Sequence, residues 1–312
     1  MKSPRYYFNI LKKSFGGFNE DHITAQSAAL AYYTVFSIAP LILIAVGIAG
    51  VFFGEQASRG EIFNAVSKLM GPEGAKGVES FVQASSEKHT GLIATLIGVA
   101  TLLIGSTTMF AQLQDTLNQI WKVRAKPSTN TIWSLVRQRL LSFSLILVIG
   151  FLLLVSLVAS AILAGIGKYL SGHLWGGEAV WHVINGAISF GVSVVLFGAI
   201  YKILPDVKLR WRDVWSGGAI TAFLFTIGKF LIGLYLGKSG VGSTYGAAGS
   251  VMIILLWTYY AAAILLFGAE CTRFRAIAAK SPLELRTGAE WINPESTCNR
   301  MEKSVQTLKK SA

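Results

Sequence analysis

Six long apolar runs constrain the fold of this chain more than any other feature of its sequence. An α-helix of about 20 apolar residues spans the roughly 30 Å hydrocarbon core of a bilayer. Only 14% of the residues are charged, against about a quarter in a soluble protein. The sequence therefore predicts an all-α, polytopic membrane protein with six transmembrane helices. The expected spans are about 28–53, 91–111, 140–167, 179–204, 214–236 and 247–270.

Basic residues alternate between the segments that connect these runs. Lys and Arg number 21 in the N-terminus, the 112–139 and 202–213 links and the segment after 270, against 6 in the other three links. Because cytoplasmic loops are enriched in Lys and Arg, both termini are expected in the cytoplasm. The same rule accounts for the net charge of +12. That excess would suggest nucleic-acid binding in a soluble protein, but no nucleic-acid partner is expected here.

The segments outside the spans give the predicted domain organisation. Residues 1–27 are basic and amphipathic, with Tyr7, Leu11 and Phe15 at helical spacing. They are expected either as a helix in the headgroup layer or as a polar lead-in. The segment 28–270 is the predicted membrane domain, and residues 271–312 are expected as a cytoplasmic polar tail, flexible from 281.

Polar residues separate the first and second spans over 55–90. Ile62, Val66 and Leu69 have helical spacing, and Gly71-Pro72 interrupts the pattern. We expect two short amphipathic helices here, on the outer side of the membrane.

Several small or cyclic residues predict where helices bend or approach one another. Pro40 lies inside the first span and removes a helical hydrogen bond, so a kink is expected there. The glycine-rich turn before the sixth span predicts a hinge at Gly242, Gly246 and Gly249. The pairs Gly50-xxx-Gly54, Ser160-xxx-Ala164 and Gly233-xxx-Gly237 permit close helix packing.

Lys229 is the clearest charge inside a predicted span. An ionisable side chain in hydrocarbon is costly unless it is paired or hydrated, so such a residue points to function. Lys229 would then contact an anionic group in a cavity, with Tyr245 and His182 as nearby candidates for the same binding site. Alternatively, its long side chain snorkels to the membrane interface.

Polar residues also gather near the predicted inner ends of the spans. They could form one cluster at a cytoplasmic mouth, or they could lie there only because helix ends are polar. The members of the predicted inner-mouth cluster are Asp21, Gln112, Asp115, Glu270 and Arg273.

Signatures of catalysis and of cofactor binding are weak. The four histidines lie far apart and form no HxxxH or HExxH pair, and no phosphate-binding loop is present. Cys271 and Cys298 fall in the predicted cytoplasmic part, where a disulfide is not expected. No metal, no cofactor and no enzymatic activity are therefore expected.

Three stretches resemble the YihY/BrkB family of bacterial inner-membrane proteins. They are QSAALAYYTVFSIAPLILIAVGIAG (26–50), ILPDVKLRWRDVWSGGAITAFLFTIGKFLIGLYL (203–236) and YGAAGSVMIILLWTYYAAAILLFGAECTR (245–273). The resemblance covers roughly residues 15–275. The residues at matching positions are Tyr32, Tyr33, Pro40, Lys229, Tyr245, Gly246 and Glu270.

This resemblance implies a multi-pass protein of the cell envelope in the bacterial inner membrane. The family has carried a ribonuclease BN label, which is regarded as a misassignment. Other members are associated with serum resistance and with export of lipopolysaccharide precursors. The resemblance implies no specific substrate.

Together these features favour a transporter or lipid translocase acting on an anionic lipid or solute. The expected partners are membrane lipids, which could be anionic lipids or lipopolysaccharide precursors, and a homo-oligomer or an envelope partner is compatible with the sequence. The alternative is a non-catalytic scaffold or assembly factor for an envelope complex. A membrane-embedded ribonuclease is a remote third.

Overall fold

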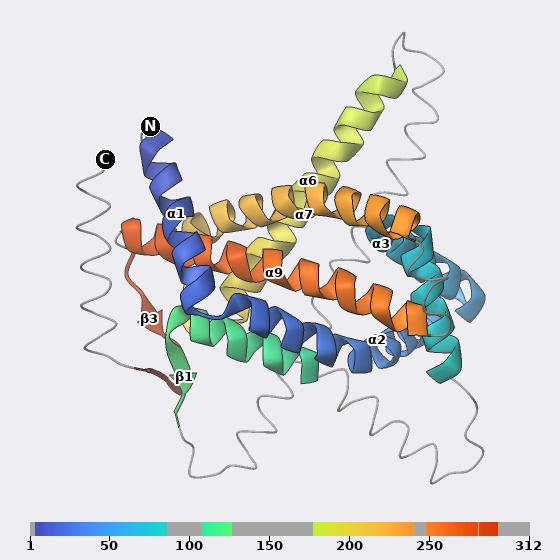
Figure 1. Ribbon diagram of the computed structural model, residues 1–312, viewed down its shortest axis with the longest axis horizontal. Helices are drawn as coiled ribbons and strands as arrows, with labels where there is room; N and C mark the ends of the chain where they lie inside the picture. The colour runs from blue at the N-terminus through green and yellow to red at the C-terminus, as the bar shows by residue number, and fades with distance from the viewer. Residues whose placement is uncertain (1–3, 86–107, 127–176, 240–247, 280, 293–312) are drawn as a thin grey trace. The chain divides into compact units, whose positions relative to one another are not determined.

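The computed structural model describes residues 4–85, 108–126, 177–239, 248–279 and 281–292, and most of them are helical (Figure 1). The helices are α1 (Pro4–Glu20), α2 (Ile23–Phe53), α3 (Glu55–Ser85), an unlabelled helix at 108–121, α6 (Gly177–Ile203), α7 (Trp211–Ser239) and α9 (Gly249–Ala278). The strands are β1 (Val123–Ala125), β2 (Val207–Lys208), β3 (Glu284–Leu285) and β4 (Ala289–Trp291).

Three of the described helices are long and apolar enough to cross a membrane, by length and composition. Their apolar stretches are Gly186–Ile203, Trp211–Tyr235 and Val251–Ala278. They coincide with the predicted fourth, fifth and sixth spans, and the first predicted span lies within α2. Residues 91–107 of the second span and the whole third span lie outside the described residues. The count of six and the cytoplasmic termini therefore stay predictions.

The chain forms two compact units, each built from segments distant in sequence. The first unit contains Met1–Lys13, Trp121–Phe223 and Gly268–Ala312, and the second contains Ser14–Ile120 and Leu224–Phe267. Helices α7 and α9 each contribute residues to both units.

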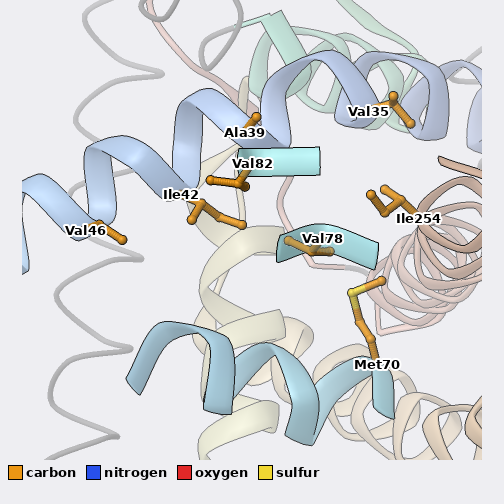
Figure 2. Close-up of a cluster of buried hydrophobic side chains, with 8 residues drawn as sticks. All are labelled: Val35, Ala39, Ile42, Val46, Met70, Val78, Val82 and Ile254. Atoms are coloured by element: carbon orange, nitrogen blue, oxygen red, sulfur yellow. The ribbon is translucent and has the colours of Figure 1, made fainter. Parts of the chain in front are cut away.

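An apolar cluster forms the core of the second unit (Figure 2). Helix α2 supplies Val35, Ala39, Ile42 and Val46, which recur every three or four residues and so share one helical face. Helix α3 contributes Met70, Val78 and Val82, and α9 contributes Ile254.

Helix α3 is two helical segments that meet at Gly71. This residue has φ 83° and ψ 168°, a conformation that glycine adopts without a Cβ clash, and Pro72 begins the second segment. The break predicted from Gly71-Pro72 is thus confirmed. Since both segments supply side chains to the core of the second unit, the insert is a packed part of that unit. Its position outside the bilayer stays a prediction.

The ends of α2 also follow from local chemistry. His22, in the left-handed conformation (φ 49°), separates α1 from α2. Gly54 has φ 83°, and its N–H donates to the carbonyl oxygen of Gly50 at 2.9 Å, which ends the helix. Between these ends the helix continues through position 40, and the bend at Pro40 stays a prediction.

The predicted flexible tail requires a correction. Helix α9 continues to Ala278, eight residues beyond the predicted end of the sixth span at 270. Strand β3 then pairs antiparallel with β2, and β4 pairs antiparallel with β1. Residues 281–292 are therefore a structured part of the first unit, while 293–312 lie outside the described residues. The sequence did not reveal these strands because two or three residues are too short to show a two-residue periodicity.

Candidate functional site

Two glycines and two threonines bring α7 and α9 into close contact in the first unit. A Cβ added to Gly217 would collide with the Thr272 hydroxyl and lie 2.9 Å from the Gly268 carbonyl oxygen. A Cβ added to Gly268 would collide with the hydroxyls of Thr221 and Tyr201. The arrangement is reciprocal, because each helix offers a Gly-xxx-Thr pair to the other. Small residues of this kind let helix backbones approach closely in membranes.

Helix α6 joins the same contact. A Cβ at Gly218 of α7 would lie 2.7 Å from the Val194 carbonyl oxygen and 3.1 Å from the Gly198 nitrogen. Tyr201 of α6, 1% exposed, forms a hydrogen bond of 2.7 Å with Thr221 of α7. Three apolar helices thus meet around a buried polar interaction.

Glu270 and Arg273 form a buried ion pair next to this contact. The Glu270 side chain is fully buried and its Oε2 lies 3.4 Å from Arg273 Nη1. Arg273 is 8% exposed, and its guanidinium lies 5.3 Å from the ring centroid of Phe274. Burying two charges is costly unless they compensate each other. Glu270 and Arg273 provide this compensation for each other inside the first unit. Asp213, in the first turn of α7, is buried as well.

A second polar cluster lies between α2 and the helix at 108–121 in the second unit. Gln26 donates to Gln119 Oε1 at 2.9 Å. Thr116 and Gln112 approach the Gln26 side-chain oxygen at 3.3 and 3.5 Å. Thr116 is also buried and donates to the carbonyl oxygen of Gln112. These amides and the hydroxyl link two helices that lie far apart in sequence.

The predicted inner-mouth residues are divided between the units. Glu270 and Arg273 form their ion pair in the first unit. Gln112 takes part in the amide cluster of the second unit, where Asp21 is half-buried and Asp115 is exposed. A single cytoplasmic mouth made of all five residues stays a prediction.

Lys229 is exposed on α7, within the stretch long enough to span a membrane. Large apolar side chains near it are exposed too: Phe230 is 67% and Leu231 56% exposed, and Tyr235, six residues after Lys229, is 55% exposed. Lys229 is therefore an exposed cation whose exposed neighbours along α7 are apolar side chains suited to lipid. Tyr245, Gly242 and Gly246 lie outside the described residues. His182 lies in α6 with a side chain outside the description, and Gly249 is buried at the start of α9.

No group of three or more His, Cys, Asp or Glu side chains within the described ranges could hold a metal ion. Cys271 is buried. The sequence prediction missed Tyr201, Thr221 and the two Gly-xxx-Thr pairs. The small-xxx-small spacing could have identified both pairs, whereas an added Cβ at Gly54 or Gly233 would meet no atom within 4 Å.

Comparison with known proteins identifies the family. Residues 14–289 match the family model described as "Virulence factor BrkB". The chain belongs to the BrkB family. Among its relatives, the UPF0761 membrane protein of Verminephrobacter eiseniae is 28% identical over 264 residues, which cover 82% of this chain and 60% of the relative. The UPF0761 membrane protein of Alcanivorax borkumensis is 27% identical over 273 residues, covering 87% and 60%.

The chain spans about 60% of the length of these relatives. No solved structure matches it. The family resemblance inferred from the sequence is thus confirmed, and the chain is a membrane protein of the BrkB family. The names of the relatives specify a membrane protein and no substrate.

Proposed function

We propose that this BrkB-family protein is a transporter or lipid translocase of the bacterial inner membrane that acts on an anionic lipid or solute. The observation that carries the proposal is Lys229, an exposed cation within the apolar stretch of α7. A lysine in the hydrocarbon region of a membrane is costly unless it is paired or hydrated, so Lys229 calls for a compensating partner. An anionic headgroup is such a partner.

The position of Lys229 along α7 fits a headgroup contact. Lys229 precedes Tyr235, the last residue of the apolar stretch, by six residues, or about 9 Å at 1.5 Å per residue. The four-carbon stem of lysine can carry its ammonium a further part of that distance toward the interface. The ammonium would thus lie near the phosphates of one leaflet while its helix face contacts acyl chains.

The first unit supports the predicted six-span topology with both termini in the cytoplasm. The N-terminal segment, the 112–139 link, the 202–213 link and the segment after 270 should share one side of the membrane. In the first unit, Ile10 of α1 packs against Phe274 and Ala278 of α9, while β1–β4 and β2–β3 join the other segments. All four basic segments are therefore connected, as a common side requires. Their content of Lys and Arg favours the cytoplasm.

The protein would act without an enzymatic step, a metal or a cofactor of its own. Gly217, Gly268 and their threonine partners hold the first half of α7 against α9 within the first unit. The chain spans about 60% of the length of its relatives. The proposed activity is therefore tested on this chain alone.

The test is lipid movement in vesicles that contain the purified chain. Fluorescent phosphatidylglycerol and phosphatidylcholine are compared by dithionite quenching of the outer leaflet. Lys229→Met should slow movement of phosphatidylglycerol about fivefold, since one cationic contact contributes about 1 kcal/mol. Lys229→Arg should retain activity. Lys126→Met removes an exposed charge in the β1 region and serves as the matched control.

A Lys229→Met protein that moves phosphatidylglycerol as fast as the wild type refutes the role of Lys229. A wild-type chain that moves neither lipid refutes lipid translocation, and the scaffold alternative then becomes the better explanation.

A further inference from the structure

An exposed cluster of arginine and tryptophan side chains lies at the start of α7, in the first unit. Arg210, Trp211, Arg212 and Trp215 are all exposed, the tryptophans by 47% and 44%. The two indole rings lie 6.1 Å apart between centroids, as expected for residues four apart on a helix. We call these four residues the arginine–tryptophan patch.

Contacts made by Lys202 and Arg286 hold the segment that carries the patch. Lys202, at the end of α6, donates to the carbonyl oxygen of Leu209 and places its ammonium 5.3 Å from the centroid of the Trp211 ring. Arg286 in turn donates to the carbonyl oxygen of Lys202 at 2.9 Å. These contacts fix the short link between α6 and α7, so Trp211 is exposed from a defined position.

No acidic side chain in the described part of the chain pairs with either arginine of the patch. Among the described residues, neither Arg210 nor Arg212 forms an ion pair or a side-chain hydrogen bond, whereas the neighbouring Lys208 is paired with Glu284 at 3.3 Å. Asp213 follows directly in sequence but is 4% exposed, so its carboxylate faces the interior. The patch therefore carries two positive charges on the surface that no acid among the described residues compensates.

The location of the patch specifies the kind of anion. The apolar stretch of α7 begins at Trp211, and tryptophan at the end of a membrane span is typical of the headgroup layer. Along the same helix, the exposed Phe223 continues the apolar surface that acyl chains would contact. Arginine binds phosphate through two parallel N–H donors.

We propose that the arginine–tryptophan patch is a binding site for the phosphate of an anionic phospholipid. Arg210 and Arg212 hold the phosphate, and the two tryptophans contact the glycerol and the upper acyl chains. The lipid acts as a bound partner that anchors the start of α7 in its leaflet. This inference is independent of the proposed role of Lys229, because it rests on different residues at the other end of the helix.

The test is native mass spectrometry of the purified full chain in a neutral detergent, titrated with dioleoyl-phosphatidylglycerol or dioleoyl-phosphatidylcholine. Two basic residues near an anionic headgroup should make phosphatidylglycerol bind about tenfold to thirtyfold more tightly than phosphatidylcholine. The double variant Arg210→Gln/Arg212→Gln should lose this preference. The variant Arg210→Lys/Arg212→Lys keeps the charge and should retain part of it.

The matched control is Lys12→Gln/Lys126→Gln, which removes two exposed charges elsewhere in the first unit and should bind like the wild type. Equal affinity for the two lipids in the wild type overturns the proposal, and so does an equal loss in the control. Inorganic phosphate or a short single-stranded RNA that binds with the same dependence on Arg210 and Arg212 also overturns it. The patch would then be a general anion site and not a lipid site.

Discussion

Replacing Gly268 by alanine tests whether the contact between α7 and α9 holds the first unit together. The added Cβ would collide with the hydroxyl groups of Thr221 and Tyr201 and lie 3.1 Å from Thr221 Cβ. Neither partner can move away easily. Thr221 is buried, β-branched and donates to the Gly217 carbonyl oxygen at 2.8 Å, and Tyr201 is almost wholly buried. The helices must therefore separate or the polar interaction must break.

The two contributions set the size of the effect. Overpacking a tight interior costs about 1–3 kcal/mol. Loss of the hydrogen bond of 2.7 Å between Tyr201 and Thr221 adds about 1 kcal/mol. A total of roughly 2–4 kcal/mol should lower the melting temperature by about 5–15 °C, at 2–4 °C per kcal/mol.

Cys271 provides the assay. It lies three residues from Gly268, it is 1% exposed, and the chain has one other cysteine, Cys298. In a Cys298→Ser background, a thiol-reactive dye reports when the first unit opens and exposes Cys271. Gly191→Ala is the matched control, because a Cβ there would meet no atom within 4 Å.

A Thr221→Ala background tests whether the Cβ added at position 268 clashes directly with Thr221. Thr221→Ala removes the hydroxyl that the new Cβ would meet, so Gly268→Ala should cost at least about 1 kcal/mol less in that background than in the wild type. Equal melting temperatures for Gly268→Ala and Gly191→Ala would refute the close contact. Additive effects of Gly268→Ala and Thr221→Ala would refute the direct clash between the two residues.

Three further perturbations test other parts of the first unit. Glu270→Gln should lower the free energy of unfolding by about 3–5 kcal/mol, because Arg273 then stays buried while its charged partner is lost. Replacing both residues by methionine should lower the free energy of unfolding much less. Thermal melting distinguishes the two variants. In an otherwise cysteine-free chain, Ala125→Cys with Ala289→Cys should form an intrachain disulfide on mild oxidation, because β1 and β4 place these positions opposite each other; two free thiols by mass spectrometry would contradict that pairing. Burial lowers the pKa of Lys13, so the folded chain disfavours the charged form of this side chain. Lys13→Met should therefore raise the melting temperature at pH 7, and this difference should disappear as the pH rises through the lowered pKa toward 10.5. A difference in melting temperature that does not change with pH would contradict this prediction.

The sequence by itself determined the class of protein and much of its helical organisation. Runs of apolar residues can be read locally, because a span must supply its own backbone hydrogen bonds and its own apolar surface. The helices α2, α6, α7 and α9 accordingly lie where these runs predicted. The break at Gly71 was predictable for the same reason, since glycine followed by proline acts on the adjacent backbone. The motifs along the chain also indicated the BrkB family.

Only the tertiary structure decided which residues meet. Gly217 and Gly268 look like many other glycines in apolar helices, and their importance arises from Thr272 and Thr221 on the facing helix. Arg210 and Arg212 became candidates for lipid binding because no described acid pairs with them, while Lys208 nearby is paired with a glutamate 76 residues away. Residues 284–285 and 289–291 became strands because residues 207–208 and 123–125 were available to pair with them. Helix formation depends on neighbours in sequence, whereas burial, pairing and exposure depend on neighbours in space.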